Sequence, residues 1–595
     1  MNLKQFLLAT LLFLCAFAKA YSQERKEIDI TSDISQIDPK YPDAFIMYKD
    51  VNQVYIVHEG IEMWCDVALH YNEENFVRAL GNVRMKQGDS VSMRSRYAEY
   101  NGDTQFAFAA GNVRLQKDTT TVTTDTLFFD RVKQQAYYRT GGVVKNPSST
   151  IKSRIGRYFM EADKFTFLSN VTITNPEYVI ESQQLDFYNQ PEHAYFYGPT
   201  TITGENSVVY CERGFYDTKE DFGYFVKNSR IDYDNRTVKG DSLYFNRARN
   251  FASATNNIRV IDTANNSLIK GHYAEVFKDK DSVFITKRAV AITAQENDSI
   301  YMHADRLLVT GKPDNRIIRG YYDARIFKSD MSGKADSIHV NQKSGLTQMI
   351  RNPIIWSGES QMTGDSIHII SNPETEKLDS LKVFENAFIV QRDTLGYNQV
   401  KGVRLSGLFN EENELYQVDI DQNAESINYI RDEEGKLQGI DKGKSGSIRM
   451  LFEDQEISEI RKIRQVDGQI YPLSMFPDNA RQFEGLVWRG DERPKTKEDI
   501  FGEEEEVELI EIEGIPLPTI EEDFFDNERS PEELNIPEAS ELSPKDFKNR
   551  EEDAPTLGIP ANDKATIRKD SIFSQRFPAN FKPVKKATDT IQDEN

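Results

Sequence analysis

The stretch Asn112-Val113-Arg114-Leu115 alternates polar and apolar residues, and it is followed by Asp125-Thr126-Leu127-Phe128-Phe129, in which an acid opens a second apolar run. Both half-patterns recur along most of the chain. Copies of the first are Asn82-Val83-Arg84-Met85, Asn170-Val171-Thr172-Ile173 and Asn257-Ile258-Arg259-Val260. Copies of the second are Asp163-Lys164-Phe165-Thr166-Phe167, Asp241-Ser242-Leu243-Tyr244-Phe245, Asp336-Ser337-Ile338-His339-Val340 and Asp365-Ser366-Ile367-His368-Ile369. Such self-similarity is typical of repeat architectures, so the sequence predicts a β-repeat protein.

The spacing of the repeat is regular. The residue before the first apolar position of each unit steps by 29, 30, 30 and 28 residues through Gln53, Asn82, Asn112, Gly142 and Asn170. Further markers are Asn228, Asn257, Asn352, Asn386 and, more weakly, Asn423. We therefore expect about thirteen two-strand units over residues 51–430.

The strands of each unit have one dry face. Val, Ile, Phe, Tyr and Thr alternate with polar residues at period two, and residues 50 to 430 lack apolar residues at helical spacing. One strand pair cannot bury its apolar face alone, so stacked copies create an apolar slot between two sheets. The positions expected to line this slot are Val83, Met85, Phe106, Phe108, Val113, Leu115, Leu127, Phe129, Phe165, Phe167, Val171, Ile173, Leu243, Phe245, Ile258 and Val260. We predict an all-β fold.

The two ends differ from the repeat. Residues 1–20 have the features of a cleavable secretion signal, with Lys4 before an apolar run and Ala18-Lys19-Ala20 as the cleavage site. Residues 21–50 form a polar lead-in, and residues 431–490 a degenerate β cap that closes the dry interior. Residues 491–595 hold 29 acidic and 14 basic residues of a chain whose formal charge is -23, and they predict a disordered acidic, Pro-rich tail.

No group in the sequence predicts catalysis, a cofactor or a metal. The repeated acids, among them Asp125, Asp163 and Asp305, are interpreted as turn or strand-entry residues rather than a calcium ladder, because nonapeptide calcium-repeat spacing is absent. His339 and His368 share an outward repeat position and are expected to be solvated. No basic stripe predicts nucleic-acid binding. The mature chain keeps Cys65 and Cys211, which we expect to be unpaired because they lie in different repeats.

The run Val54-Tyr55-Ile56, Ala79-Leu80-Gly81-Asn82-Val83 and Ala110-Gly111-Asn112-Val113 resembles the OstA-like family of periplasmic lipopolysaccharide-transport bridges and outer-membrane translocon domains. The resemblance implies an elongated double-layered β-jellyroll, open along one side, that carries lipid A acyl chains. It also implies a location in the periplasm, free or at the outer membrane. Implied partners are lipopolysaccharide, an inner-membrane-side protein near Val54 and an outer-membrane transport protein at the C-terminal units. Head-to-tail self-association is left open.

Other functions remain compatible with the pattern. If the sheets close tightly, the apolar stripe is an ordinary core, and the chain is a secreted β-helix adhesin. A polysaccharide-acting enzyme on a β-helix is a further alternative, although it requires a local cluster of charged residues that interrupts the repeat, and the sequence has none.

Overall fold

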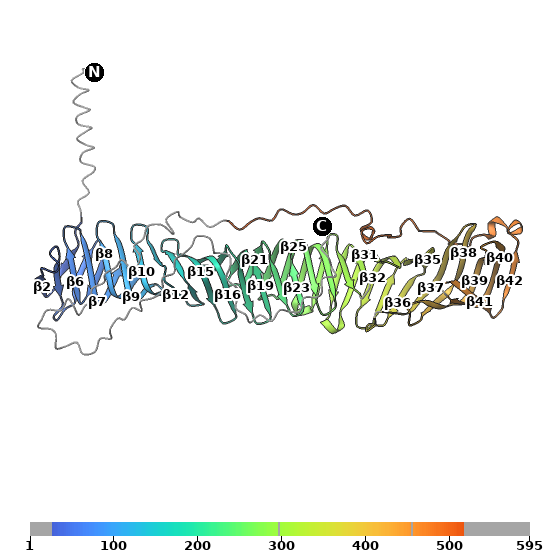
Figure 1. The fold of residues 1–595 in the computed structure, drawn as a ribbon, viewed down its shortest axis with the longest axis horizontal. Helices are drawn as coiled ribbons and strands as arrows, with labels where there is room; N and C mark the ends of the chain where they lie inside the picture. Colours follow the sequence, from blue (N-terminus) through green and yellow to red (C-terminus); the bar gives the residue numbers. More distant parts are fainter. Residues whose placement is uncertain (1–25, 296–297, 376, 433, 454–455, 517–595) are drawn as a thin grey trace, which may run out of the picture. The chain divides into compact units, whose positions relative to one another are not determined.

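The computed structural model describes residues 26–295, 298–375, 377–432, 434–453 and 456–516. Within these ranges the chain is almost entirely antiparallel β, with only short 3-10 helices, so the all-β prediction is confirmed (Figure 1). No helix in the part so described has the length and apolar character to span a membrane. The predicted signal, residues 1–20, lies outside the described residues.

The chain divides into two compact units. Of the described residues, unit 1 holds 26–118 and 125–133, and unit 2 holds 119–124 and those from 134 to 516. The strands of unit 1 are β1 (Asp29–Thr31), β2 (Ile34–Ile37), β3 (Phe45–Tyr48), β4 (Val54–His58), β5 (Ile61–Cys65), β6 (Val67–Tyr71), β7 (Phe76–Gln87), β8 (Val91–Asn101) and β9 (Phe106–Lys117). β10 (Thr120–Asp130) is divided between the units. The segment predicted as a lead-in therefore contains β1, β2 and β3.

Unit 2 contains the remaining elements. Its short strands up to residue 310 are β11 (Gln135–Tyr138), β12 (Gly142–Lys145), β13 (Thr150–Ser153), β14 (Ile155–Phe159), β17 (His193–Phe196), β18 (Thr200–Gly204), β19 (Ser207–Cys211), β20 (Arg213–Asp217), β21 (Phe222–Val226), β22 (Arg230–Tyr233), β23 (Arg236–Lys239), β24 (Ser242–Asn246), β27 (Ser282–Thr286), β28 (Val290–Ala294), β29 (Ser299–His303) and β30 (Arg306–Thr310). Later short strands are β33 (Leu346–Ile350), β34 (Ile354–Ser357), β35 (Ser360–Thr363), β36 (Ser366–Ser371), β41 (Glu456–Ile463) and β42 (Asp467–Tyr471).

Its long strands are β15 (Lys164–Thr174), β16 (Tyr178–Tyr188), β25 (Phe251–Asp262), β26 (Ser267–Phe277), β31 (Ile317–Lys328), β32 (Met331–Asn341), β37 (Leu378–Asp393), β38 (Gly396–Phe409), β39 (Leu415–Arg431) and β40 (Leu437–Glu453). The 3-10 helices are η1 (Lys278–Lys280), η2 (Pro313–Asn315), η3 (Leu473–Met475), η4 (Asp478–Ala480) and η5 (Asp499–Phe501).

Each long strand belongs to two layers. The first part of β25 pairs with β24 and its last part with β23, and the register shifts between Thr255 and Ile258. We call the layer that contains β24 layer 1 and the layer that contains β23 layer 2. The same shift occurs in β7, β15, β31, β37 and β39, so the predicted double-layered β-jellyroll is confirmed.

The shift is a β-bulge, and it explains the repeated asparagine. Asn82, Asn112, Asn257 and Asn386 sit at the bulges with φ of 45°, 52°, 48° and 53°. Asparagine adopts this left-handed conformation at lower cost than other side chains that carry a Cβ. A bulge leaves an extra residue unpaired and bends the strand, which lets one strand continue from one layer into the other.

At several bulges an acid from an earlier position in the chain binds the asparagine. The side-chain amide of Asn257 donates to Asp241 over 2.7 Å, and Asn386 donates to Asp365 over 3.0 Å. The backbone N–H of Asp241 also donates to the bulge carbonyl of Asn256 over 3.1 Å. Asp163 differs, since it has φ of 46° in a turn and accepts from Tyr158. Within the described residues, no group of three or more His, Cys, Asp or Glu residues could hold a metal ion.

Both cysteines are free and buried, Cys65 in unit 1 and Cys211 in unit 2. Burial raises the pKa of each thiol above its ordinary value. Each thiol therefore stays protonated at neutral pH, as expected for a cysteine that acts as a small apolar residue.

The structure changes the prediction for the C-terminal region. Residues 472–490 do not close the interior, because Phe476 and Phe483 pack against Val390 and Ile427 on the outer face of layer 2. Residues 491–516, the first part of the predicted tail, continue in extended form along unit 2. Apolar side chains spaced among the acids hold them there, and Ile500 is 1% exposed.

Candidate functional site

The interior between the layers is where the sequence places its candidate residues. In unit 1 the ring Nδ1 of His58 on β4 lies 2.8 Å from the hydroxyl of Tyr100 on β8. β4 belongs to the layer of the last part of β7, whereas Tyr100 lies in the part of β8 that pairs with the first part of β7, in the opposite layer, so Tyr100 points inward. Ala107 pairs with Tyr100, and its neighbours Phe106 and Phe108 therefore point outward.

The inward prediction for Phe106 and Phe108 is thus wrong. Both rings contact the outward Phe128, with centroids 6.3 and 5.1 Å away. Tyr100 is 1% exposed, and the inward positions of β9 at this level are Ala107 and Ala109. Period-two alternation alone cannot tell which of two apolar faces is the inner one.

The other candidates point into the interior and are buried. In unit 1 Met85 pairs with Met93, which pairs with Leu115, on the face that carries His58. The remaining buried candidates of unit 1 and β10 are Val83, Val113, Leu127 and Phe129. Those of unit 2 are Phe165, Phe167, Val171, Ile173, Leu243, Phe245, Ile258 and Val260. That these positions touch lipid remains a prediction.

Aromatic rings fill much of the interior of unit 2. Tyr158 and Phe165 stack with centroids 4.0 Å apart, and Phe167 follows at 5.4 Å from Phe165. Between the layers, Tyr138 on β11 lies 2.7 Å from the Ser153 hydroxyl on β13. Burial raises the pKa of Tyr138 to about 12, so its hydroxyl stays neutral inside the apolar space.

One side cleft of about 660 Å³ opens between the layers of unit 2. Its apolar lining comes from Ile231, Tyr233 and Val238 in layer 2 and from Phe245, Ala252 and Val276 in layer 1. Its rim carries Glu177, Glu205, Arg247 and Lys278, two acids and two bases. A volume of this size lies within the range of ligand-binding pockets. Phe245 is the predicted candidate that reaches it.

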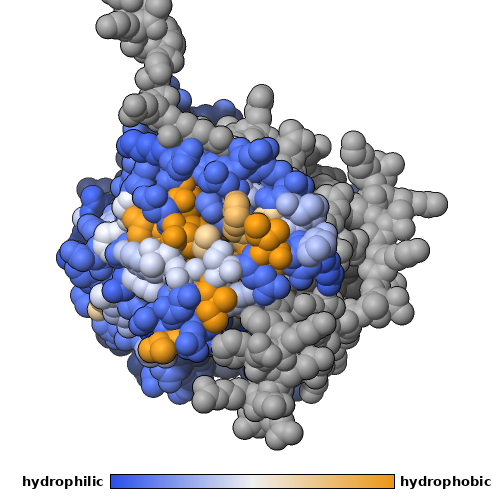
Figure 2. Space-filling view, turned by 90° about the vertical axis from the view of Figure 1, so that its left-hand side faces the viewer, coloured by the Kyte–Doolittle hydropathy of each residue, from blue (hydrophilic) through white to orange (hydrophobic). Residues whose placement is uncertain are grey.

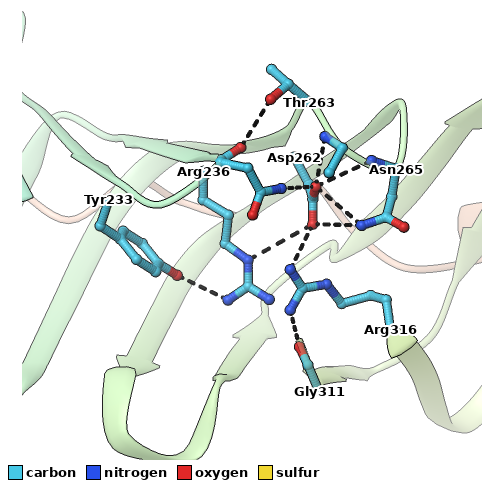
Figure 3. A network of polar contacts seen from close by, with 9 residues as sticks. Tyr233, Arg236, Asp262, Thr263, Asn265, Gly311 and Arg316 are labelled. Atoms are coloured by element: carbon cyan, nitrogen blue, oxygen red, sulfur yellow. Dashed lines mark hydrogen bonds and ion pairs between the residues drawn. The ribbon is translucent and has the colours of Figure 1, made fainter. Parts of the chain in front are cut away.

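A buried ion-pair cluster lies beside this cleft (Figure 3). Asp262 at the end of β25 contacts Arg316, with a nitrogen–oxygen distance of 3.1 Å, and Arg236, at 3.8 Å. Arg236 also donates to the hydroxyl of Tyr233, which lines the cleft, over 3.0 Å. Arg316 immediately precedes β31 in layer 1, while Asp262 and Arg236 belong to layer 2, so the cluster ties the layers together.

This cluster is not among the predicted site residues. Arg236 and Asp262 occupy inward repeat positions two residues from Val238 and Val260, where an apolar residue is expected. Charged side chains at such positions are the signal that could have identified it, because a buried charge requires a partner.

A second pair of cross-layer contacts lies on the other side of the cleft. Tyr178 on β16 packs edge-on against Tyr216 on β20, with ring centroids 5.5 Å apart. Its hydroxyl donates to the carbonyl of Thr218 over 3.1 Å. The cleft is therefore bordered by layer-to-layer contacts at Tyr178 and at Asp262.

The free end of unit 1 is apolar at its centre. Figure 2 shows hydrophobic residues there, framed by hydrophilic ones. Ile37 of β2 and Phe45 of β3 are 67% and 44% exposed. β2 pairs with β3, and it offers an edge on which a strand of another chain can add.

Sequence comparison agrees with this geometry at the N-terminal part of the chain. The family model described as OstA-like protein matches residues 27–183. These residues are therefore similar to OstA-like proteins. No curated protein matches the chain in sequence.

Among solved structures, the chain is similar to LptH from Pseudomonas aeruginosa, described as the LptA homologous periplasmic component of the conserved lipopolysaccharide transport device. The two share 16% sequence identity over 24% of this chain and 99% of LptH, with a TM-score of 0.18. The matched residues 27–183 include β4 to β9 and the His58–Tyr100 contact, and they end within β16, so that of the residues that line the side cleft they contain Pro176 and Glu177.

Proposed function

We propose that the protein is a periplasmic bridge that passes lipopolysaccharide towards the outer membrane, with the acyl chains between the two layers and the sugars in water. The match of residues 27–183 to the OstA-like family carries this proposal. The apolar interior and the side cleft of unit 2 support it, because they offer acyl chains contacts without bond-making chemistry.

Burial of the acyl chains supplies the free energy that keeps the lipid in the protein. Each methylene removed from water contributes about 0.8 kcal/mol, so roughly ten methylenes contribute about 8 kcal/mol. A lipid whose acyl chains cross an aqueous space in contact with water loses this stabilisation. Apolar side chains at equivalent positions of successive repeats would provide it again each time the lipid moves from one repeat to the next. Away from the cleft the inward side chains bury one another, so passage requires the layers to separate locally.

The proposed orientation follows the chain. The exposed edge of β2 would accept a strand from an inner-membrane-side partner, and the C-terminal units would meet an outer-membrane transport protein. Site-specific crosslinking from Ile37 and from Ile463, which is 40% exposed on β41, tests this assignment. Capture of different partners from the two sites supports it, and capture of one and the same partner from both contradicts it.

Photocrosslinking tests lipid binding directly. A photoreactive amino acid at Val276, which lines the cleft, should form an adduct with purified lipopolysaccharide. The same residue at Glu275, on the opposite face of the same strand, is the matched control and should form none. Equal adducts from both sites, or none from Val276, would contradict an acyl-chain site between the layers.

A further inference from the structure

Residues 472–516 form an extended segment along unit 2, which we call the strap. It follows β42, runs back over the outer face of layer 2 to the bulge of β25, and ends beyond it, where the Tyr224 hydroxyl on β21 donates to the carbonyl of Glu513 over 3.5 Å (Figure 1). It is hydrogen-bonded to side chains that are up to 289 residues away in sequence. The contacts of the strap are of three kinds.

The first kind is a bracket in which one side-chain amide binds the strap backbone twice. Gln399 donates to the carbonyl of Arg481 over 2.8 Å and accepts from the N–H of Phe483 over 2.8 Å. Gln361 donates to the carbonyl of Val487 over 2.6 Å and accepts from the N–H of Arg489 over 2.9 Å.

A third bracket binds the far end of the strap. Asn256 donates to the carbonyl of Ile510 over 2.7 Å and accepts from the N–H of the same residue over 3.2 Å. The bracketing side chains are buried, with Gln399 0%, Gln361 2% and Asn256 3% exposed. An amide that pairs with both groups of an extended backbone recognises the backbone itself, and removing it leaves buried polar groups unpaired.

The second kind of contact is an apolar anchor between brackets. Phe476 and Phe483 pack with Val390, Ile427 and Ile440 of layer 2 in one cluster. Further along the strap, the ring of Phe501 lies 4.9 Å from the ring of His303, centroid to centroid. The guanidinium carbon of Arg288 lies 4.3 Å from the centroid of the Phe501 ring. A bracket can bind the backbone of any residue, so it does not determine which strap residue lies at which position of the sheet. The apolar anchors determine this register.

The third kind is charge pairing. Glu492 of the strap lies 3.0 Å from the ammonium of Lys334, and Arg489 holds the same carboxylate at 2.6 Å. Further along the strap, the Glu504 carboxylate accepts from the backbone N–H of Arg288 over 3.2 Å, and the Arg288 guanidinium donates to the backbone carbonyl of Glu504 over 3.0 Å. The acids of the strap thus face bases of the sheet.

We propose that the outer face of layer 2 from β25 to β40 is a receptor for an extended polypeptide, and that the strap is its own ligand, bound in cis. Brackets bind any extended backbone, while the spaced aromatic anchors select the register, as in other modes of extended-peptide recognition. The strap therefore stays bound without its covalent link, and its affinity depends on the brackets. The proposal is independent of what lies between the layers.

Cleavage of the full chain tests it. Met475 is 72% exposed, so a specific protease site placed there should be cut without disturbing the packed residues on either side. After cleavage the C-terminal fragment should co-elute with the body in size-exclusion chromatography. The Gln361→Met, Gln399→Met double variant keeps the side-chain size but removes both brackets, and should release the fragment roughly 10- to 100-fold faster for each bracket lost.

Gln116→Met, an exposed glutamine of unit 1, is the control and should behave as the native protein. Amide hydrogen exchange of β15 and β16, in unit 2, checks that the double variant is folded, and that of β7 to β9 checks the control. Immediate release of the fragment from the cleaved native protein would overturn the proposal. Equal release rates for the double variant and the control would overturn it as well.

Discussion

Replacing Asp262 by alanine removes the carboxylate that Arg236 and Arg316 share between the layers of unit 2. The side chains of the two arginines are 3% and 2% exposed, so water cannot take over the role of the carboxylate. Breaking a buried ion pair from one side costs about 3–5 kcal/mol, because the remaining charge stays buried without compensation. At about 1.4 kcal/mol per factor of ten, local opening becomes roughly two to three and a half orders of magnitude more frequent.

Native-state hydrogen exchange is the suitable assay, since a long repeat array does not unfold in two states and a single midpoint is poorly defined. The amides of β23, the last part of β25 and the first part of β31 should lose protection, while those of β7 to β9 should not. Asp232→Ala is the matched control in the neighbouring hairpin, where an acid bonds Thr237 and Arg230 on the outer face.

A partly exposed pair of this kind contributes only about 0–1 kcal/mol. The two variants should therefore differ by more than tenfold in the opening of β25. Equal effects, or a less than tenfold change in Asp262→Ala, would refute the idea that this cluster holds the layers together.

Three further predictions concern the bulge, the strap and the thiols. Asn257→Ala should lower the stability of its repeat by about 1–2 kcal/mol in hydrogen exchange, whereas Asn257→Gly should cost less, because glycine accepts the positive φ; equal losses would contradict a conformational role. The Arg489 guanidinium holds the pKa of Glu492 at about 2, below its ordinary 4.5, so this carboxylate stabilises the strap above pH 4.5 and the contribution is lost as the pH falls towards 2. Glu492→Gln should flatten the pH dependence of strap protection over that window, and an unchanged profile would argue against the assignment. Cys65 and Cys211 should resist a maleimide in the native protein and react after denaturation, as peptide mapping can show; rapid native labelling would contradict their burial.

The sequence alone determined the strand content and the repeat. These features depend on local chemistry, which one strand pair already expresses: alternation at period two, and an asparagine at the residue that must take a positive φ. The OstA-like resemblance came from the same local pattern in residues 50–145 of the sequence.

Only the tertiary structure decided which apolar face is inside and what covers the outside. Phe106 and Phe108 face outward because Tyr100 from the neighbouring strand fills the space opposite Ala107, and alternation cannot show that contact. The strap has no periodic pattern, since it binds through brackets from residues such as Gln361, over a hundred positions away. Burial, charge partners and side-chain amides that bind a distant backbone are properties of the assembled layers, and no single stretch of sequence contains them.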